Sequence, residues 1–176
     1  AASSMNVPFI ASSASTYSME EIASVMGNSP RWFQLYWSNE REIAASMLRR
    51  AEASGYSAIV VTLDAAMMAW RESDLENAYL PFLSGEGVGN YVSDPVFRSM
   101  LKDPPEVDAK AAATLWAKVF GNASLTWDDL EFLRDHTSLP ILLKGILHPD
   151  DAKLAIDHGM DGIIVSNHGG RQVDGA

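Results

Sequence analysis

The sequence alternates short apolar runs with segments of helical spacing, and this alternation is what most constrains the fold. Strands are expected at residues 7–10, 32–36, 58–64, 140–145 and 163–166, the last as a fully buried strand. Strands that alternate with helices in this way form a parallel sheet with right-handed crossover connections. The sequence therefore predicts an α/β domain with about five parallel strands.

The helical segments have recognisable beginnings and ends. Ser18 and Glu21 form a capping box for a helix that ends near Gly27. Asn39 is expected to cap the next helix, which Gly55 closes. Further helices are expected at residues 109–120, from residue 126 to before Pro140, and at 149–159.

Residues 65–107 interrupt the alternation. They are rich in Gly, Pro, Ser and Asn and have no clean period. A connection of this length without a strong element is uncommon inside a compact domain and is usually a lid or a disordered loop. We therefore expect a long loop or lid after the third strand.

Composition limits the classes of function. A chain of 176 residues is long enough for a core, and residues 1–176 are expected to form a single domain. Its net charge of −10 argues against binding to a nucleic-acid backbone. No apolar run approaches the ~20 residues of a membrane span, and no secretory signal is evident. The chain has no cysteine, which rules out disulfides and thiolate zinc sites and fits a reducing cytoplasm.

Polar residues stand at the end of every expected strand. They are Ser12, Gln34 with Tyr36, Thr62 with Asp64, Lys144, and Ser166 with His168. A barrel takes its catalytic groups from the ends of several strands, whereas a doubly wound sheet concentrates its site at one switch point. No dinucleotide-type glycine turn follows the first strand, and no P-loop is present. Because five strands cannot close an eight-stranded barrel, we expect an incomplete portion of a TIM (β/α)8-type barrel.

The closing stretch, residues 162–174, carries the densest chemistry. Asn167, His168, two glycines and Arg171 follow the last apolar run. Histidine can take or give a proton near neutral pH, and the arginine fork suits a carboxylate or phosphate. The glycines permit a turn with positive φ or a close approach to a ligand. We interpret this set as part of an active site rather than as a solvated polar turn.

Other candidate residues are consistent with two roles each. Lys144 could stabilise an anion that forms during a reaction, or extend to solvent. Asp64 could pair with His168 and raise its basicity, or be a helix-cap or loop residue. Arg71 could reach back to the same site or be solvated. The two polar residues of the second strand share a face by the period of two, and each is equally consistent with a core position.

A set of motifs carries a resemblance to a known family. The motifs are Phe33-Gln34-Leu-Tyr36, Thr62-x-Asp64, Trp70-Arg71-x-x-Asp74-Leu, Leu142-Leu-Lys144-Gly145 and Ser166-Asn-His168-Gly-Gly-Arg171-Gln. In this order, and over essentially the whole chain, they resemble the FMN-dependent 2-hydroxy acid oxidases. The last motif is highly specific. Leu80-Pro-Phe-Leu with Asn90-Tyr-x-Ser-Asp-Pro-Val-Phe97 is most similar to the lactate 2-monooxygenase branch.

The resemblance implies a TIM barrel of which this chain holds strands 2 to 6. It implies oxidation of a small L-2-hydroxy acid such as lactate, with FMN as cofactor, oxygen as acceptor, and a homo-oligomer of the tetramer type. The family segments that bind the FMN phosphate do not align with this sequence. The alternative is therefore a non-catalytic fragment of such an enzyme that binds no flavin.

The resemblance also implies roles for individual residues. His168 would be the base that takes a proton from the substrate α-carbon or hydroxyl, with Asp64 as its partner. Lys144 would stabilise negative charge on the reduced flavin. Arg171 and Tyr36 would hold the substrate carboxylate and hydroxyl, and Arg71 would support the same anion. The implied contacts to the flavin ring and ribityl chain are Ser12, Gln34, Thr62 and Ser166.

Overall fold

The computed structural model describes residues 1–67, 69–79 and 81–173. Leu80, which begins one of the family-like motifs, and Asp174, which ends the closing stretch, lie outside the described residues. The strands are β1 Phe9–Ser12, β2 Arg31–Tyr36, β3 Ile59–Thr62, β4 Ile141–Lys144 and β5 Gly162–Ile164.

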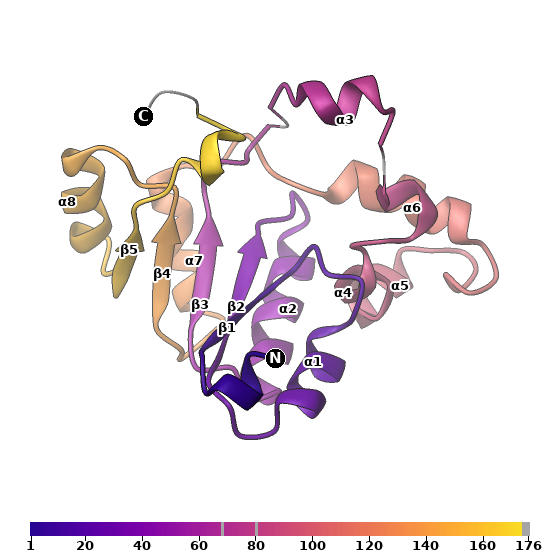
Figure 1. Cartoon of the computed structure of the whole chain (residues 1–176), viewed down its shortest axis with the longest axis horizontal. Helices are drawn as coiled ribbons and strands as arrows, with labels where there is room; N and C mark the ends of the chain where they lie inside the picture. Colours follow the sequence, from indigo (N-terminus) through magenta and orange to yellow (C-terminus); the bar gives the residue numbers. More distant parts are fainter. Residues whose placement is uncertain (68, 80, 174–176) are drawn as a thin grey trace.

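The five strands form one sheet in the order β1-β2-β3-β4-β5, and every neighbouring pair is parallel. The parallel sheet predicted from the sequence is therefore confirmed. The strand order never reverses along the chain, which is the order of a barrel segment rather than of a doubly wound sheet. Figure 1 shows the strands as a curved, open sheet with helices packed against one side.

Helices connect the strands and cover one face of the sheet. The longer ones are α1 Met19–Met26, α2 Arg41–Ala53, α6 Ala109–Val119 and α8 Pro149–Asp157, with the shorter α7 Leu130–Arg134 before β4. The 3-10 helices are η1 Ser3–Met5, η2 Pro81–Ser84, η3 Trp127–Asp129 and η4 His168–Gly170. Ser18 caps α1 with the complete capping box that the sequence predicts.

The core lies between the sheet and these helices. Alternate residues of the central strands point to it and are fully or almost fully buried. They are Phe33, Leu35, Ile59, Val61, Ile141 and Leu143. They join Ile43, Met47 and Leu48 of α2 and Leu133 of α7 in one hydrophobic cluster. The opposite face, which would be the inside of a barrel, stays partly accessible at Trp32, Leu142 and Ile164.

Three local predictions were wrong. The first strand begins at Phe9, because Pro8 has no N–H to donate to the sheet. The last strand is Gly162–Ile164 and only half-buried, since it has a described neighbour on one side only, and Val165 beyond it is 71% exposed. Glu40, not Asn39, stands at the N-cap of α2, because the Asn39 amide donates to the carbonyl of Lys118 instead.

The segment 65–107 contains α3 Glu72–Glu76, η2, α4 Gly89–Val92 and α5 Pro95–Ser99. Figure 1 shows α3 above the carboxyl ends of the strands, whereas α4 and α5 lie against the body of the domain beside α6. Tyr91 and Phe97 are fully buried in the core. The second half of the segment is therefore part of the packed structure.

Leu143 and Leu75 offer a test of where the core lies. Replacing the fully buried Leu143 by Ala should lower the free energy of unfolding by about 2–5 kcal/mol, since it removes apolar contacts and leaves a cavity. The same change at Leu75, which is exposed on α3, should cost less than about 0.5 kcal/mol. Urea unfolding measures both variants, and equal losses would contradict this assignment of the core.

Candidate active site

The turn after β5 holds His168 in an uncommon backbone conformation. His168, Gly169 and Gly170 have φ angles of +63°, +63° and +72°. This region is ordinary for glycine but costs about 1–2 kcal/mol for a residue with a Cβ. The Ser166 hydroxyl accepts a hydrogen bond from the backbone N–H of His168, and the Asn167 side chain accepts one from Gly170. A strained non-glycine residue held by its own turn is typical of a functional position.

The imidazole of His168 contacts side chains from the ends of three other strands. Its Nδ1 lies 3.0 Å from the Asp64 carboxylate and 3.5 Å from the Lys144 ammonium, and its Nε2 lies 3.3 Å from the Tyr36 hydroxyl. The expected contact between Asp64 and His168 is thus present. No helix in the described part of the chain begins at Asp64, so its alternative role as a helix cap is not observed.

The contacts of His168 determine which ring nitrogen carries the proton. The Asp64 carboxylate can only accept, so the shortest contact requires a proton on Nδ1. The Nε2 lone pair then points toward Tyr36, where it can accept a proton. Asp64 holds the ring in this tautomer and would stabilise the positive charge that the ring gains as a base.

Asp64 itself is almost inaccessible, with a side chain that is 3% exposed. Its Oδ2 atom is buried and has no hydrogen-bond partner among the described residues. Gly145, with φ +102°, makes room for it: a Cβ there would lie 2.8 Å from Asp64 Cβ and Cγ. The glycine after Lys144 is therefore what lets the carboxylate approach the end of β4.

Tyr36 is a hydrogen-bond donor across the ordinary pH range. Burial raises the pKa of its phenol above the usual value, and the nearby Asp64 charge raises it further, while the Arg71 charge acts in the opposite direction. The hydroxyl therefore keeps its proton at neutral pH. It can donate to an anionic or electron-rich oxygen beside His168.

A hydrogen-bonded row of polar side chains crosses the ends of β1, β2 and β3. The Ser12 hydroxyl donates to Gln34 Oε1 at 2.6 Å, and Gln34 Nε2 donates to the Thr62 hydroxyl at 2.7 Å. Gln34 and Thr62 are buried. This row and Lys144 form a continuous polar edge along the inner side of the sheet.

The two candidate arginines are placed differently. Arg71 borders a cavity of about 310 Å³ that Ala14, Tyr36 and Phe120 also line. Its guanidinium donates to Gln172 at 3.4 Å, and its Nε atom is buried without a partner among the described residues. Arg171 is exposed, and the one hydrogen bond of its side chain within the described residues goes to the carbonyl of Gly169. The structure therefore brings Arg71 to the cluster but not Arg171.

Gln172 ties the closing turn to the segment after β3, a role that sequence reasoning did not assign to it. Its amide donates to the carbonyls of Asp64 and Met67, and its Oε1 accepts from Ala69 N–H and from Arg71. The only signal for this role in the sequence is its position directly after Arg171.

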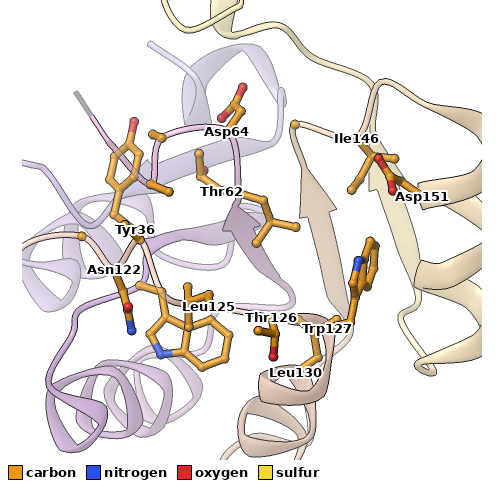
Figure 2. Close-up of a pocket in the computed structure, with 17 residues that line it drawn as sticks. Tyr36, Thr62, Asp64, Asn122, Leu125, Thr126, Trp127, Leu130, Ile146 and Asp151 are labelled. Carbon is orange, nitrogen blue, oxygen red and sulfur yellow. The ribbon is translucent and has the colours of Figure 1, made fainter. Parts of the chain in front are cut away.

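A second cavity, of about 280 Å³, lies beside the ends of β3 and β4. Figure 2 shows Tyr36 and Asn122 at one end of it and Ile146 and Asp151 at the other, with Trp127 near the second end. It shares Tyr36, Ala65, Ala66 and Gly121 with the first cavity, so one wall separates the two.

In the described ranges no group of three or more His, Asp or Glu could hold a metal ion, and no helix is long and apolar enough to cross a membrane.

Comparison with known proteins yields consistent matches over the whole chain. A family model described as FMN-dependent dehydrogenase matches residues 1–176. An L-lactate oxidase from Lysinibacillus sphaericus is 50% identical over 175 residues, which are 99% of this chain and 45% of that protein. An FMN-dependent alpha-hydroxy acid dehydrogenase from Penicillium citrinum is 45% identical over 177 residues, 99% of this chain and 44% of that protein.

Solved structures of mandelate oxidase are also similar. The structure with (S)-4-hydroxymandelic acid has a TM-score of 0.78 and 39% identity, covering 99% of this chain and 46% of that one. A tyrosine-to-phenylalanine mutant of mandelate oxidase with a C4a-OH-FMN adduct has a TM-score of 0.76 and 36% identity, covering 99% and 44%. The barrel-type fold expected from the sequence is confirmed. The chain spans less than half the length of these relatives.

The close approach of Gly145 to Asp64 can be tested with a matched glycine. Gly145→Ala and Gly159→Ala both place alanine at positive φ, but an added Cβ at Gly159 meets nothing within 4 Å. Both should lose about 1 kcal/mol or more of stability from backbone strain. Only Gly145→Ala should also displace Asp64 and change the NMR chemical shifts of the His168 ring. Identical His168 shifts in both variants would show that Gly145 does not position Asp64.

Proposed function

Because the chain belongs to the family of FMN-dependent dehydrogenases, we propose that it oxidises a small L-2-hydroxy acid such as lactate, with FMN as cofactor and oxygen as acceptor. The resemblance read from the sequence motifs is confirmed at the level of the family. The proposed activity is of the lactate 2-monooxygenase or oxidase type, which differ in whether the oxo acid leaves before oxygen reacts. A relative named L-lactate oxidase at 50% identity supports lactate as the substrate.

The observation that carries the proposal is the environment of the His168 imidazole. One nitrogen is held by a buried carboxylate, and the other faces a protonated tyrosine beside a cavity that an arginine borders. Tyr36 and Arg71 line the cavity, and His168 lies 3.3 Å from the Tyr36 hydroxyl. Oxidation of a hydroxy acid requires such a base, hydrogen-bond donor and cation. The base accepts a proton from the substrate, and the donor and cation bind its anionic end.

The polar side chains at the strand ends fit a flavin. An isoalloxazine ring presents carbonyl oxygens and ring nitrogens along one edge, which need donors. Within the described part of the chain, the Gln34 amide uses only one of its two N–H groups. The Lys144 ammonium finds no acceptor there, because the His168 Nδ1 atom 3.5 Å away carries a proton. We assign flavin contact to Ser12, Gln34, Thr62, Lys144 and Ser166.

Conversion of a 2-hydroxy acid to a 2-oxo acid removes two electrons and two protons. FMN, when bound, would supply the acceptor for the electron pair and for one of the two protons. His168 Nε2 takes one proton, either from the α-carbon or from the hydroxyl, while Asp64 stabilises the imidazolium. Tyr36 donates its O–H to the substrate oxygen. Lys144 supplies positive charge where the flavin gains negative charge.

Substrate binding is assigned to Arg71, Arg171, Tyr36 and His168. Arg71 already borders the cavity beside Tyr36. Arg171 is exposed, and its long side chain must turn inward to reach a carboxylate at His168.

We further propose a cytoplasmic homo-oligomer of the tetramer type that binds no nucleic acid or membrane. The net charge of −10 supports the absence of nucleic-acid binding.

The alternative is a non-catalytic fragment that binds no flavin, because the chain covers 45% of the L-lactate oxidase. A visible absorption spectrum of the purified protein with added FMN, followed by anaerobic L-lactate, separates the two. Bound flavin whose absorption bands bleach supports the oxidase. Flavin that stays free supports the fragment.

Removal of the His168 imidazole should abolish the proton transfer but leave the flavin bound. The rate of flavin reduction in His168→Ala should fall by about 10²–10⁴-fold, the usual contribution of a general base. His148→Ala is the control, since the His148 side chain is exposed at the start of α8 and away from the cluster. Anaerobic stopped-flow measures both rates, and an unchanged rate in His168→Ala would rule out the assignment of the base.

Removal of the Tyr36 hydroxyl should weaken the binding of the transition state. A hydrogen bond to a charged group contributes about 1.5–3 kcal/mol, so kcat/KM for L-lactate should fall by about 10–100-fold in Tyr36→Phe. Tyr17→Phe removes a hydroxyl from an exposed ring and should have no effect. Steady-state kinetics with both variants decides whether Tyr36 contacts the substrate.

A further inference from the structure

We propose that Asn90 is a positioning residue for the active site. It lies in α4, within the long segment between β3 and β4, and it holds the end of β1 where the polar row and Tyr36 are anchored. The contacts of Asn90 within the chain identify the residues that it positions. That they face a flavin and a hydroxy acid rests on the proposed function.

Every polar atom of the Asn90 side chain is used in binding other parts of the chain. The residue is fully buried. Its Nδ2 donates to the carbonyls of Ser12 and Ser13, at 3.1 and 3.3 Å, and its Oδ1 accepts from the backbone N–H of Met19 at 2.8 Å. The amide therefore joins the end of β1 to the first residue of α1, although Asn90 is more than 70 residues away from both in sequence.

The two serines held by Asn90 connect it directly to the active site. The Ser12 hydroxyl donates to Gln34, which begins the polar row proposed to contact the flavin. The Ser13 hydroxyl accepts from the backbone N–H of Tyr36 at 2.9 Å, and Ser13 N–H donates to the Gln34 carbonyl. A shift of this turn would move Ser12 and loosen the backbone of Tyr36.

A buried ion pair keeps Asn90 in place. Arg50 of α2 donates to the Asn90 carbonyl and to Asp94 Oδ2, each at 2.9 Å. Asp94 is fully buried, caps α5 through the N–H groups of Val96 and Phe97, and accepts from the Ser46 hydroxyl. Removal of one member of such a pair leaves an uncompensated buried charge. The pair therefore fixes α4 and α5 on α2.

The backbone of α4 and the backbone of the turn after β1 also lie close together. Gly89 N–H donates to the Ser15 carbonyl at 2.8 Å, and Gly87 N–H donates to the Thr16 hydroxyl. A Cβ at Gly89 would lie 2.3 Å from the Thr16 carbonyl oxygen. Only glycine allows the two segments to approach this closely. The long segment is thus bound to the rim of the site at α4.

The test compares Asn90→Asp with Asn77→Asp in the same segment. Asn90→Asp keeps the size and the Oδ1 acceptor but removes both donors, so the bond from Met19 survives and the bonds to Ser12 and Ser13 are lost. Asn77 is exposed and donates only to the nearby Ser73 carbonyl. Backbone hydrogen exchange is measured without flavin, and FMN affinity and L-lactate kinetics are measured with it.

The Ala14 N–H donates to the Ser12 hydroxyl at 3.1 Å, and the Tyr36 N–H donates to the Ser13 hydroxyl. For Asn90→Asp we expect both N–H groups to exchange about tenfold faster or more, with Met19 still protected. FMN affinity should fall, and KM should rise more than kcat falls. Asn77→Asp should match the unchanged protein in each measurement. Exchange that is faster throughout the chain would show that Asn90 has only a general structural role. That outcome, or unchanged exchange at Ala14 and Tyr36, would overturn the proposal.

Ser13→Ala provides a second variant in case Asn90→Asp does not fold. It removes only the acceptor for Tyr36 N–H, the next link in the same chain of contacts. Faster exchange at Tyr36 together with a raised KM is expected, and no change in either would contradict the proposal. If the unchanged protein binds no FMN, the proposed function fails, but the exchange pattern still decides whether Asn90 positions this turn.

Discussion

The site depends on the contact between Asp64 and His168, which are 104 residues apart in sequence. Their meeting requires that β3, β4 and β5 pair in parallel and in register, because one residue follows β3 and the other follows β5. It also requires a glycine at the end of the strand between them, since any larger residue at position 145 would occupy the space of the Asp64 side chain. The sheet, the glycine and the turn together produce one hydrogen bond.

Several features at this contact are unfavourable by themselves. His168 has a positive φ, Asp64 has a buried oxygen without a partner in the described part of the chain, and Lys144 places its ammonium near the same ring. Such features persist only where the surrounding structure determines them. The packed face of the sheet against α2 and α7 supplies that stability, while the opposite face carries the polar groups. Stability and chemistry are thus separated onto the two faces of the same strands.

Much of this arrangement follows from the sequence, because strand-end residues of a parallel sheet meet at one edge whatever lies between them. That rule was sufficient to expect Asp64 beside His168 and Gln34 near Ser12 and Thr62. It could not show that β5 is half-buried, which depends on the absence of a second described neighbour. It could not place Arg171, whose long side chain is not fixed by the strand. The Asn39 amide failed as a cap because a distant carbonyl on α6 was available to it.

The residues that the sequence did not reveal share a physical character. Gln172 and Asn90 are primary amides whose partners are mainly backbone carbonyls and N–H groups from distant segments. Any residue type can supply a backbone carbonyl or N–H group, so no sequence motif indicates such contacts. Yet both amides attach the long segment between β3 and β4 to the rim of the site, Gln172 near the start of the segment and Asn90 at α4. Arg71 lies between these two attachments, so both help to hold the stretch that brings its guanidinium to the cavity beside Tyr36.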